Sequence, residues 1–317
     1  MSNADFSAQP DAAPSQIAGM MAMCAAMALL PIGDAISKTL TGFAAPFDVT
    51  VWRTLAQAIW FLPLLLLARK GLRGSVLSWP AVLSGALVAV VSLCLIYAYR
   101  TMPIATAISI FFIEPLVLTL LAGPFLGEKP GMRRYIAVAI GLIGALIVIR
   151  PNFEIFGPVV LLPALGALAY ALNMIVLRKA TRKHRSALSF QIGVALSGAA
   201  ILGGAQLALG LMGRHTTPLS DLPGWALGAL FASGALIALT FLLITLAFSK
   251  VEASLLAPLQ YLEILGATLV GYLVFGNFPD ALTILGTSII LASGIYVFYR
   301  ERKSGAPARK IRARIDR

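Results

Sequence analysis

The chain has 317 residues, of which 59% are hydrophobic and only 12% are charged. A soluble domain carries about a quarter charged residues, so this composition excludes an ordinary soluble protein and predicts a chain surrounded by lipid. The net charge of +12 comes mostly from short clusters of Lys and Arg between apolar runs, which is typical of membrane-protein loops and not of a nucleic-acid-binding surface.

Ten apolar runs are each long enough for a membrane-spanning helix, which needs roughly 20 residues. Residues 1–15 are polar and lack the basic start of a signal peptide, so we expect a disordered cytoplasmic tail before a retained first helix. The expected fold class is an all-α integral membrane protein, because open strands cannot satisfy their backbone hydrogen bonds in lipid. The ten predicted spans are 16–40, 48–68, 76–98, 102–126, 132–150, 157–177, 187–212, 222–248, 252–275 and 279–299.

The basic residues predict the orientation of these spans. If the N-terminus is cytoplasmic, most of the 25 Lys and Arg fall in cytoplasmic loops or in the basic tail at residues 301–317. This bias predicts a multi-pass protein with both termini on the cytoplasmic side. We expect the tail to contact anionic lipid.

The second half of the chain repeats the first at a shift of 149 residues, without a gap. The identical pairs include residues that a chance similarity of apolar runs would not supply: Glu114 with Glu263, Gly127 with Gly276, and Pro130 with Pro279. Each repeat holds five predicted spans, in residues 16–150 and 157–300. Because five is odd, the two repeats cross the membrane in opposite directions, as in many secondary transporters whose substrate site lies between the halves.

The first repeat ends in "FFIEPLVLTLLAGPFLGEKPGMRRYIAVAIGLIGALIVI", where "LGE" precedes basic residues and a glycine-rich helix. This segment and the ten-helix repeat resemble the EamA family of the drug/metabolite transporter superfamily. The second repeat departs from the pattern, with Asn277 where the acid is expected. The resemblance covers residues 16–300 and implies a secondary transporter. The family includes amino-acid exporters of the YddG type and carriers of S-adenosylmethionine or sugars.

Two charged residues, Asp34 and Lys38, lie in the first span. A charge at the centre of a spanning helix costs about 2.5–3.5 kcal/mol, and the spacing of four places both residues on one face in an order that favours an ion pair. Pro31 and Gly33 are hinge candidates, since a kink there would free carbonyl groups. We interpret the pair as part of a polar pathway; alternatively both lie near the outer headgroups. Arg53 either pairs with Asp34 or faces the headgroups.

Glu114 and Glu263 lie close to the predicted midplane and are equivalent in the two repeats. A carboxyl at this depth can bind a proton or, when ionised, a substrate amine. Pro115 and Pro258 are hinge candidates beside them, where the helices could unwind. The alternative is that each carboxyl bonds to a neighbouring helix for purely structural reasons.

Five uncharged polar residues are further candidates for the site. Tyr97, Asn173 and Gln260 are expected to line a cavity, and Tyr170 and Tyr261 are secondary candidates. A cavity that mixes apolar walls with a few polar groups suits small amphiphilic solutes; the alternative for each is an interhelical hydrogen bond. Tyr99, which is nearer the outer surface, is interpreted as an interfacial anchor.

The sequence contains no P-loop motif, and its two His residues lie in loops on opposite sides of the membrane. No nucleophile in a helix can be matched with a His, and no metal-ligand spacing occurs. We therefore expect no enzymatic activity, no cofactor and no metal.

The function that the sequence favours is secondary-active export of amino acids, aromatic ones above all, by alternating access through a central cavity. The alternatives are an uptake or exchange carrier for a nucleotide-like metabolite of the S-adenosylmethionine type or a sugar, and, in other classes, a membrane-embedded enzyme or a passive channel. The expected partners are a small-molecule substrate and membrane lipids, with protons as a further candidate. We expect a monomer or a homodimer.

Overall fold

The computed structural model describes residues 12–67, 75–127, 131–181, 187–213, 217–251 and 253–315, and every regular element among them is helical. The α-helices are α1 (Ala12–Leu40), α2 (Pro46–Leu67), α3 (Trp79–Thr101), α4 (Ile104–Phe111), α5 (Glu114–Leu126), α6 (Met132–Phe156), α7 (Leu161–Thr181), α8 (Ala187–Leu211), α9 (Gly224–Lys250), α10 (Ala253–Gln260), α11 (Leu262–Phe275) and α12 (Ala281–Ile315). Two short 3₁₀ helices, η1 (Gly157–Val160) and η2 (Leu219–Asp221), lie between them.

Seven helical stretches in the described part of the chain are long and apolar enough to cross a membrane. One of them, Met132–Leu177, has 46 residues and covers α6, η1 and most of α7, which correspond to two of the predicted spans. A further apolar helix, Ala281–Val297, is shorter. The chain is therefore a multi-pass helical membrane protein, as its composition predicts.

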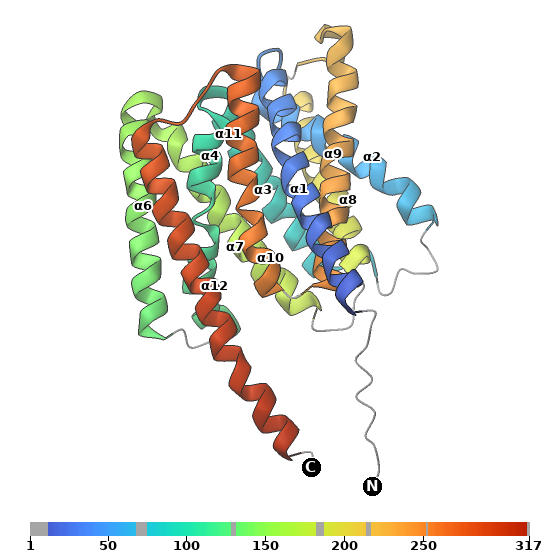
Figure 1. Cartoon of the computed structure of the whole chain (residues 1–317). Helices are drawn as coiled ribbons and strands as arrows, with labels where there is room; N and C mark the ends of the chain where they lie inside the picture. The colour runs from blue at the N-terminus through green and yellow to red at the C-terminus, as the bar shows by residue number, and fades with distance from the viewer. Residues whose placement is uncertain are drawn as a thin grey trace.

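The helices run side by side in a bundle, with α1 beginning and α12 ending on the same side (Figure 1). Within the bundle α1 packs against α9, α3 against α7 and α8, and α6 against α12. The α6–α12 contact is close because Gly144 faces the backbone of Gly286, where a Cβ atom would have no space. Small residues at such contacts let helix backbones approach within a membrane.

Two of the predicted spans are interrupted at corresponding points. Span 102–126 is divided into α4 and α5, and span 252–275 into α10 and α11. Phe112 and Tyr261 lie at the two breaks and coincide at the shift of 149 residues. The helix that follows each break ends at a left-handed glycine, Gly127 (φ 71°) or Gly276 (φ 67°). A positive φ costs little only for a glycine, so the repeated sequence folds into a repeated local structure.

The hinge candidates occupy different positions relative to these breaks. Pro115 lies in the first turn of α5, where proline is tolerated because the backbone N–H there has no helical partner. Pro258 lies inside α10, before its break. Helix α1 continues without interruption through Pro31 and Gly33, and Pro31 packs against Gly266 of α11.

Both ends of the described chain are helical. Helix α1 begins at Ala12, inside the segment predicted to be disordered, while residues 1–11 lie outside the described residues. Helix α12 continues to Ile315, so the predicted basic tail at residues 301–317 begins as an extension of that helix.

Many of the largest fully buried side chains gather at one end of the bundle. They include Leu40, Ile96, Tyr99, Met102, Ile104, Ile108 and Ile110. They come from the end of α1, the end of α3 and the whole of α4, which lie at the end opposite the start of α1 (Figure 1). The side chains of this end pack next to the cavity described below.

Candidate functional site

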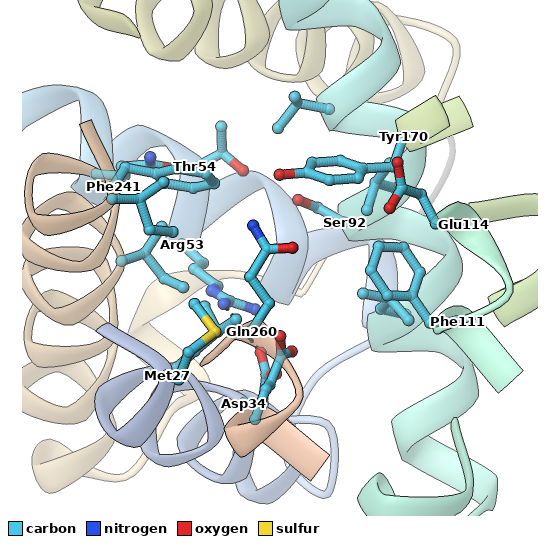
Figure 2. Close-up of a pocket in the computed structure, with 18 of the residues that line it drawn as sticks. Met27, Asp34, Arg53, Thr54, Ser92, Phe111, Glu114, Tyr170, Phe241 and Gln260 are labelled. Carbon is cyan, nitrogen blue, oxygen red and sulfur yellow. Dashed lines mark hydrogen bonds and ion pairs between the residues drawn. The ribbon is translucent and has the colours of Figure 1, made fainter. Parts of the chain in front are cut away.

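A pocket lies in the middle of the bundle and is lined by α1, α2, α3, α5, α7, α9 and both helix breaks (Figure 2). It encloses about 1100 Å³ of space, a volume that includes the open solvent at its mouth. Its charged lining residues are Asp34, Arg53, Glu114 and Glu263; its ring-bearing residues are Phe111, Phe112, Tyr170 and Phe241; its uncharged polar residues are Thr54, Gln57, Ser92 and Gln260.

Asp34 is the centre of a buried polar cluster that joins three helices. Arg53 of α2 donates from Nη2 to Asp34 Oδ1 at 3.1 Å, and Tyr99 of α3 donates from its hydroxyl to Asp34 Oδ2 at 3.0 Å. All three residues are buried, and Tyr99 is fully inaccessible. A buried charge pair is tolerated when its geometry is good and its remaining lone pairs are hydrogen-bonded. Arg53 therefore pairs with Asp34 and does not face the headgroups.

The expected Asp34–Lys38 pair does not form. Lys38 donates from Nζ to the carbonyl oxygen of Met102 at 2.6 Å, and Nζ lies 5.1 Å from the centre of the Phe275 ring. Met102 caps the end of α3, where backbone carbonyls lack helical partners and the helix dipole attracts a cation. The carboxylate of Asp34 is bound by Arg53, so Asp34 and Lys38 of the first span bind different partners.

The break between α10 and α11 places Gln260 and Glu263 on the pocket. The Gln260 amide points into the centre of the cavity (Figure 2). Glu263 is 7% exposed, lies in the first turn of α11 and is close enough to Asp34 to interact electrostatically. Tyr261 does not line the pocket; its ring packs against that of Phe112, with centroids 5.4 Å apart.

The break between α4 and α5 places Phe111 and Glu114 on the pocket. The ring of Phe111 packs against that of Tyr170 from α7, with centroids 5.7 Å apart. Tyr170 is within electrostatic reach of both Glu114 and Glu263. Figure 2 shows Glu114, Tyr170 and Phe111 grouped on one side of the pocket, with Asp34 and Arg53 across from them. The pocket thus has an aromatic side and a charge-paired side.

Two predicted lining residues do not reach the pocket, and one tyrosine was assigned the wrong environment. Tyr97 is 41% exposed and Asn173, although buried in α7, is not on the pocket wall. Tyr99, interpreted from sequence as an interfacial anchor, is buried against Asp34 instead. Helical geometry explains why Tyr99, and not Tyr97, faces the interior. Tyr99 lies seven residues after Ser92 and four after Leu95, on the pocket face of α3, whereas Tyr97 points away from that face.

Some lining residues were missed although a pattern could have identified them. Gln57 lies four residues after Arg53 and so shares its helix face, and Ser92 lies seven residues before Tyr99. Phe111 and Phe241 stand in uniformly apolar runs that give no such indication. Among the described residues no group of three or more His, Cys, Asp or Glu side chains could hold a metal ion.

A bundle of apolar helices around a buried, charged pocket defines a polytopic membrane protein with an internal solute-binding cavity. The chain belongs to the EamA-like transporter family, whose profile matches it twice, at residues 14–150 and at residues 157–299. The resemblance noted from the sequence is confirmed.

Known proteins similar to this chain are also transporters. The S-adenosylmethionine uptake transporter of Rickettsia conorii is 30% identical over 271 residues, which cover 86% of this chain and 89% of that protein. The riboflavin transporter of Rhizobium johnstonii is 31% identical over 209 residues, which cover 65% and 66%. A crystal structure that is 19% identical covers 90% of this chain and 97% of its own with a TM-score of 0.58, which shows a shared fold. The chain is a membrane transporter and not an enzyme.

Proposed function

We propose that the chain is a secondary-active carrier for a small amphiphilic metabolite that has both a flat ring and a positively charged group. The observation that carries this proposal is the composition of the pocket, where three carboxyls face one guanidinium beside a set of aromatic rings. Arg53 is paired with Asp34, and the described pocket wall carries more carboxyls than basic side chains, a composition that favours a cationic substrate. Phe111 and Tyr170 offer ring faces on which a planar group stacks.

S-adenosylmethionine has the chemistry that this pocket favours. It combines an adenine ring with a sulfonium and an ammonium group, and a similar protein of Rickettsia conorii is named for its uptake. Riboflavin, for which another relative is named, has a flat ring system but no cationic group. A sugar has neither a flat ring system nor a cationic group, so it would use neither the aromatic rings nor the excess of carboxyls on the pocket wall.

Export of aromatic amino acids is the second candidate, and the aromatic side of the pocket supports it. The ammonium group of phenylalanine would pair with Glu114 and its ring would meet Phe111. Its carboxylate, however, needs a cation, and Arg53 is engaged by Asp34. Amino-acid binding would therefore require the Asp34–Arg53 pair to open, which makes this candidate weaker than a cationic substrate.

We propose that the carrier works by alternating access between two inverted five-helix repeats. The support is the recurrence of both helix breaks and both left-handed glycines at a shift of 149 residues. In the orientation that the basic loops favour, with both termini on the cytoplasmic side of a bacterial inner membrane, the packed end of the bundle faces outward. The conformation described here is then closed to the outside.

Counterflow in proteoliposomes tests this function. Liposomes preloaded with unlabelled S-adenosylmethionine are exposed to the labelled compound, and a parallel set uses phenylalanine. We expect saturable entry of S-adenosylmethionine that internal substrate accelerates, because a carrier exchanges and a pore does not. Tyr97→Phe, on the exposed face of α3, is the control that should transport normally.

The outcomes separate the candidates. Exchange of phenylalanine alone would select the amino-acid carrier and reject the cationic substrate. Non-saturable entry would identify a channel. Entry no faster than in empty liposomes for both compounds would reject both substrates while leaving the family assignment intact.

A further inference from the structure

Glu263 is a nearly buried carboxyl on the wall of the pocket. It is 7% exposed, and it makes no hydrogen bond or ion pair with any other described residue. Asp34, by contrast, has both oxygens bound, one by Arg53 and one by Tyr99. An ionised carboxylate at such a position is strongly disfavoured, and the group becomes neutral unless a cation accompanies it.

No cation is left over for Glu263 among the described lining residues. Arg53 is the one positively charged residue on the pocket wall, and Asp34 neutralises it. Lys38 lies further towards the packed end, where it bonds to Met102. An ionised Glu263 would add a second carboxylate beside Asp34, with which it interacts electrostatically.

The neighbours of Glu263 are contributed by every helix around the pocket. The titratable or charged groups are Asp34 and Lys38 of α1, Arg53 of α2, Tyr99 of α3, Glu114 of α5 and Tyr170 of α7. Helix α9 contributes the apolar Ile237, Phe241 and Ile244, α10 contributes Gln260, and α4 adds the ring of Phe111. The formal charges of Asp34, Lys38, Arg53 and Glu114 cancel, so ionisation of Glu263 adds one negative charge to this part of the cavity.

We propose that Glu263 is the proton-binding site of the carrier, and that a proton and the cationic group of the substrate neutralise the pocket in turn. The inference rests on the proposed function and deepens it. When the substrate cation arrives beside Glu114, the O–H bond of Glu263 breaks and the proton leaves to solvent; when the substrate leaves, Glu263 is protonated again. A proton gradient directed into the cell then drives the substrate outward.

The test compares two activities of the same proteoliposomes. Counterflow needs only substrate exchange, whereas accumulation of labelled S-adenosylmethionine in vesicles with an acidic lumen needs proton release as the label enters. If phenylalanine is the compound that exchanges, it serves as the probe. Wild-type protein should accumulate the probe above equilibrium, and collapsing the pH gradient should abolish this.

Glu263→Gln imitates a permanently protonated side chain. We expect this variant to retain counterflow and to lose accumulation driven by the pH gradient completely. Glu263→Asp keeps a carboxyl in a shifted position and should retain accumulation with a displaced pH optimum. Glu154→Gln is the matched control, because Glu154 is an exposed acid of α6 away from the pocket; both of its activities should equal those of the wild type.

Each result decides the matter. Accumulation by Glu263→Gln at the wild-type level would overturn the proposal, and so would wild-type accumulation that requires an alkaline lumen. If Glu263→Gln loses counterflow as well as accumulation, the test depends on Glu263→Asp. An unchanged pH optimum of accumulation in Glu263→Asp then overturns the proposal. Absence of wild-type counterflow would instead remove the proposed function, on which the inference depends.

Discussion

The two helix breaks share their backbone geometry but differ in their surroundings. At each break an eight-residue helix is followed directly by an aromatic residue, Phe112 or Tyr261, and a glutamate lies in the first turn of the next helix. Glu114 is partly buried near the rings of Phe111 and Tyr170. Glu263 is nearly inaccessible and lies near the buried Asp34–Arg53 pair.

This difference shows how a duplicated sequence can provide two kinds of site. The repeat conserves the break and the carboxyl, and the helices packed against each break supply the chemistry. An aromatic environment suits a cationic, planar substrate, whereas a nearly buried carboxyl with no spare cation among the described lining residues suits a proton. We expect substitutions on the two sides of the pocket to separate substrate affinity from stability and coupling.

The largest expected effect is on the charge-paired side. Arg53→Met leaves Asp34 buried without its cation, and removal of one partner of a buried pair costs about 3–5 kcal/mol. We expect the free energy of unfolding in detergent to fall by that amount, as followed by tryptophan fluorescence during denaturant titration. Transport should be lost as well, because Arg53 joins α2 to α1.

A double variant distinguishes an ion pair from simple packing. Asp34→Asn combined with Arg53→Met leaves no uncompensated charge, so it should be more stable than Arg53→Met alone. Equal or greater instability of the double variant would mean that the charge of Asp34 is not what makes Arg53 necessary.

On the aromatic side the effect should be on affinity. Glu114→Gln removes the carboxylate proposed to meet the substrate cation, and a charged hydrogen bond of about 1.5–3 kcal/mol corresponds to a weakening of about tenfold to a hundredfold. We expect the KM for labelled S-adenosylmethionine to rise accordingly while inhibition by neutral adenosine stays unchanged. A similar loss for adenosine would point to a general disturbance of the pocket.

A smaller effect is expected from the hydroxyl of Tyr99. Tyr99→Phe removes one donor from Asp34 but leaves Arg53 in place, so the loss of stability should be about 1–2 kcal/mol. Tyr97→Phe is the matched control on the exposed face of the same helix and should change stability by less than about 0.5 kcal/mol. The comparison fails if the two variants are equally affected.

This pair of tyrosines also marks the limit of what the sequence predicts. Composition and the length of apolar runs predicted a helical membrane protein, and the internal repeat led to the family, because these features depend on the chain alone. The rotation of each helix about its axis depends on its neighbours. Tyr97 and Tyr99 stand two residues apart at the end of one apolar run, just before Arg100, and no amphipathic pattern along that run indicated which one faces inward.

The charged residues were easier to find than their partners. Asp34, Arg53, Glu114 and Glu263 stand out in apolar runs because charges are costly in lipid, and all four line the pocket. The spacing of Asp34 and Lys38 suggested a local pair, yet a residue from another helix took the carboxylate. The spacing of two charges along one helix is therefore a poor predictor of pairing when a charged residue of a neighbouring helix is buried beside one of them.

The smallest expected effect on stability comes from replacing Tyr261 at the second break by the phenylalanine found at the first. Tyr261 corresponds to Phe112, and its hydroxyl is buried against Gly294 of α12 with no hydrogen-bond partner among the described residues. Tyr261→Phe should therefore be neutral or stabilising by up to about 1 kcal/mol, because it removes a buried polar atom that gains nothing from burial. The measurement is the free energy of unfolding in detergent, with transport expected to be unchanged.

Gly294 provides the control for this prediction. A methyl group at Gly294 would overlap the Tyr261 hydroxyl, so Gly294→Ala alone should destabilise the protein, and adding Tyr261→Phe should recover part of the loss. A loss of stability in Tyr261→Phe by itself would show that the hydroxyl has a favourable partner, such as a water molecule. The second break would then differ from the first in its aromatic residue as well as in the charges around its glutamate.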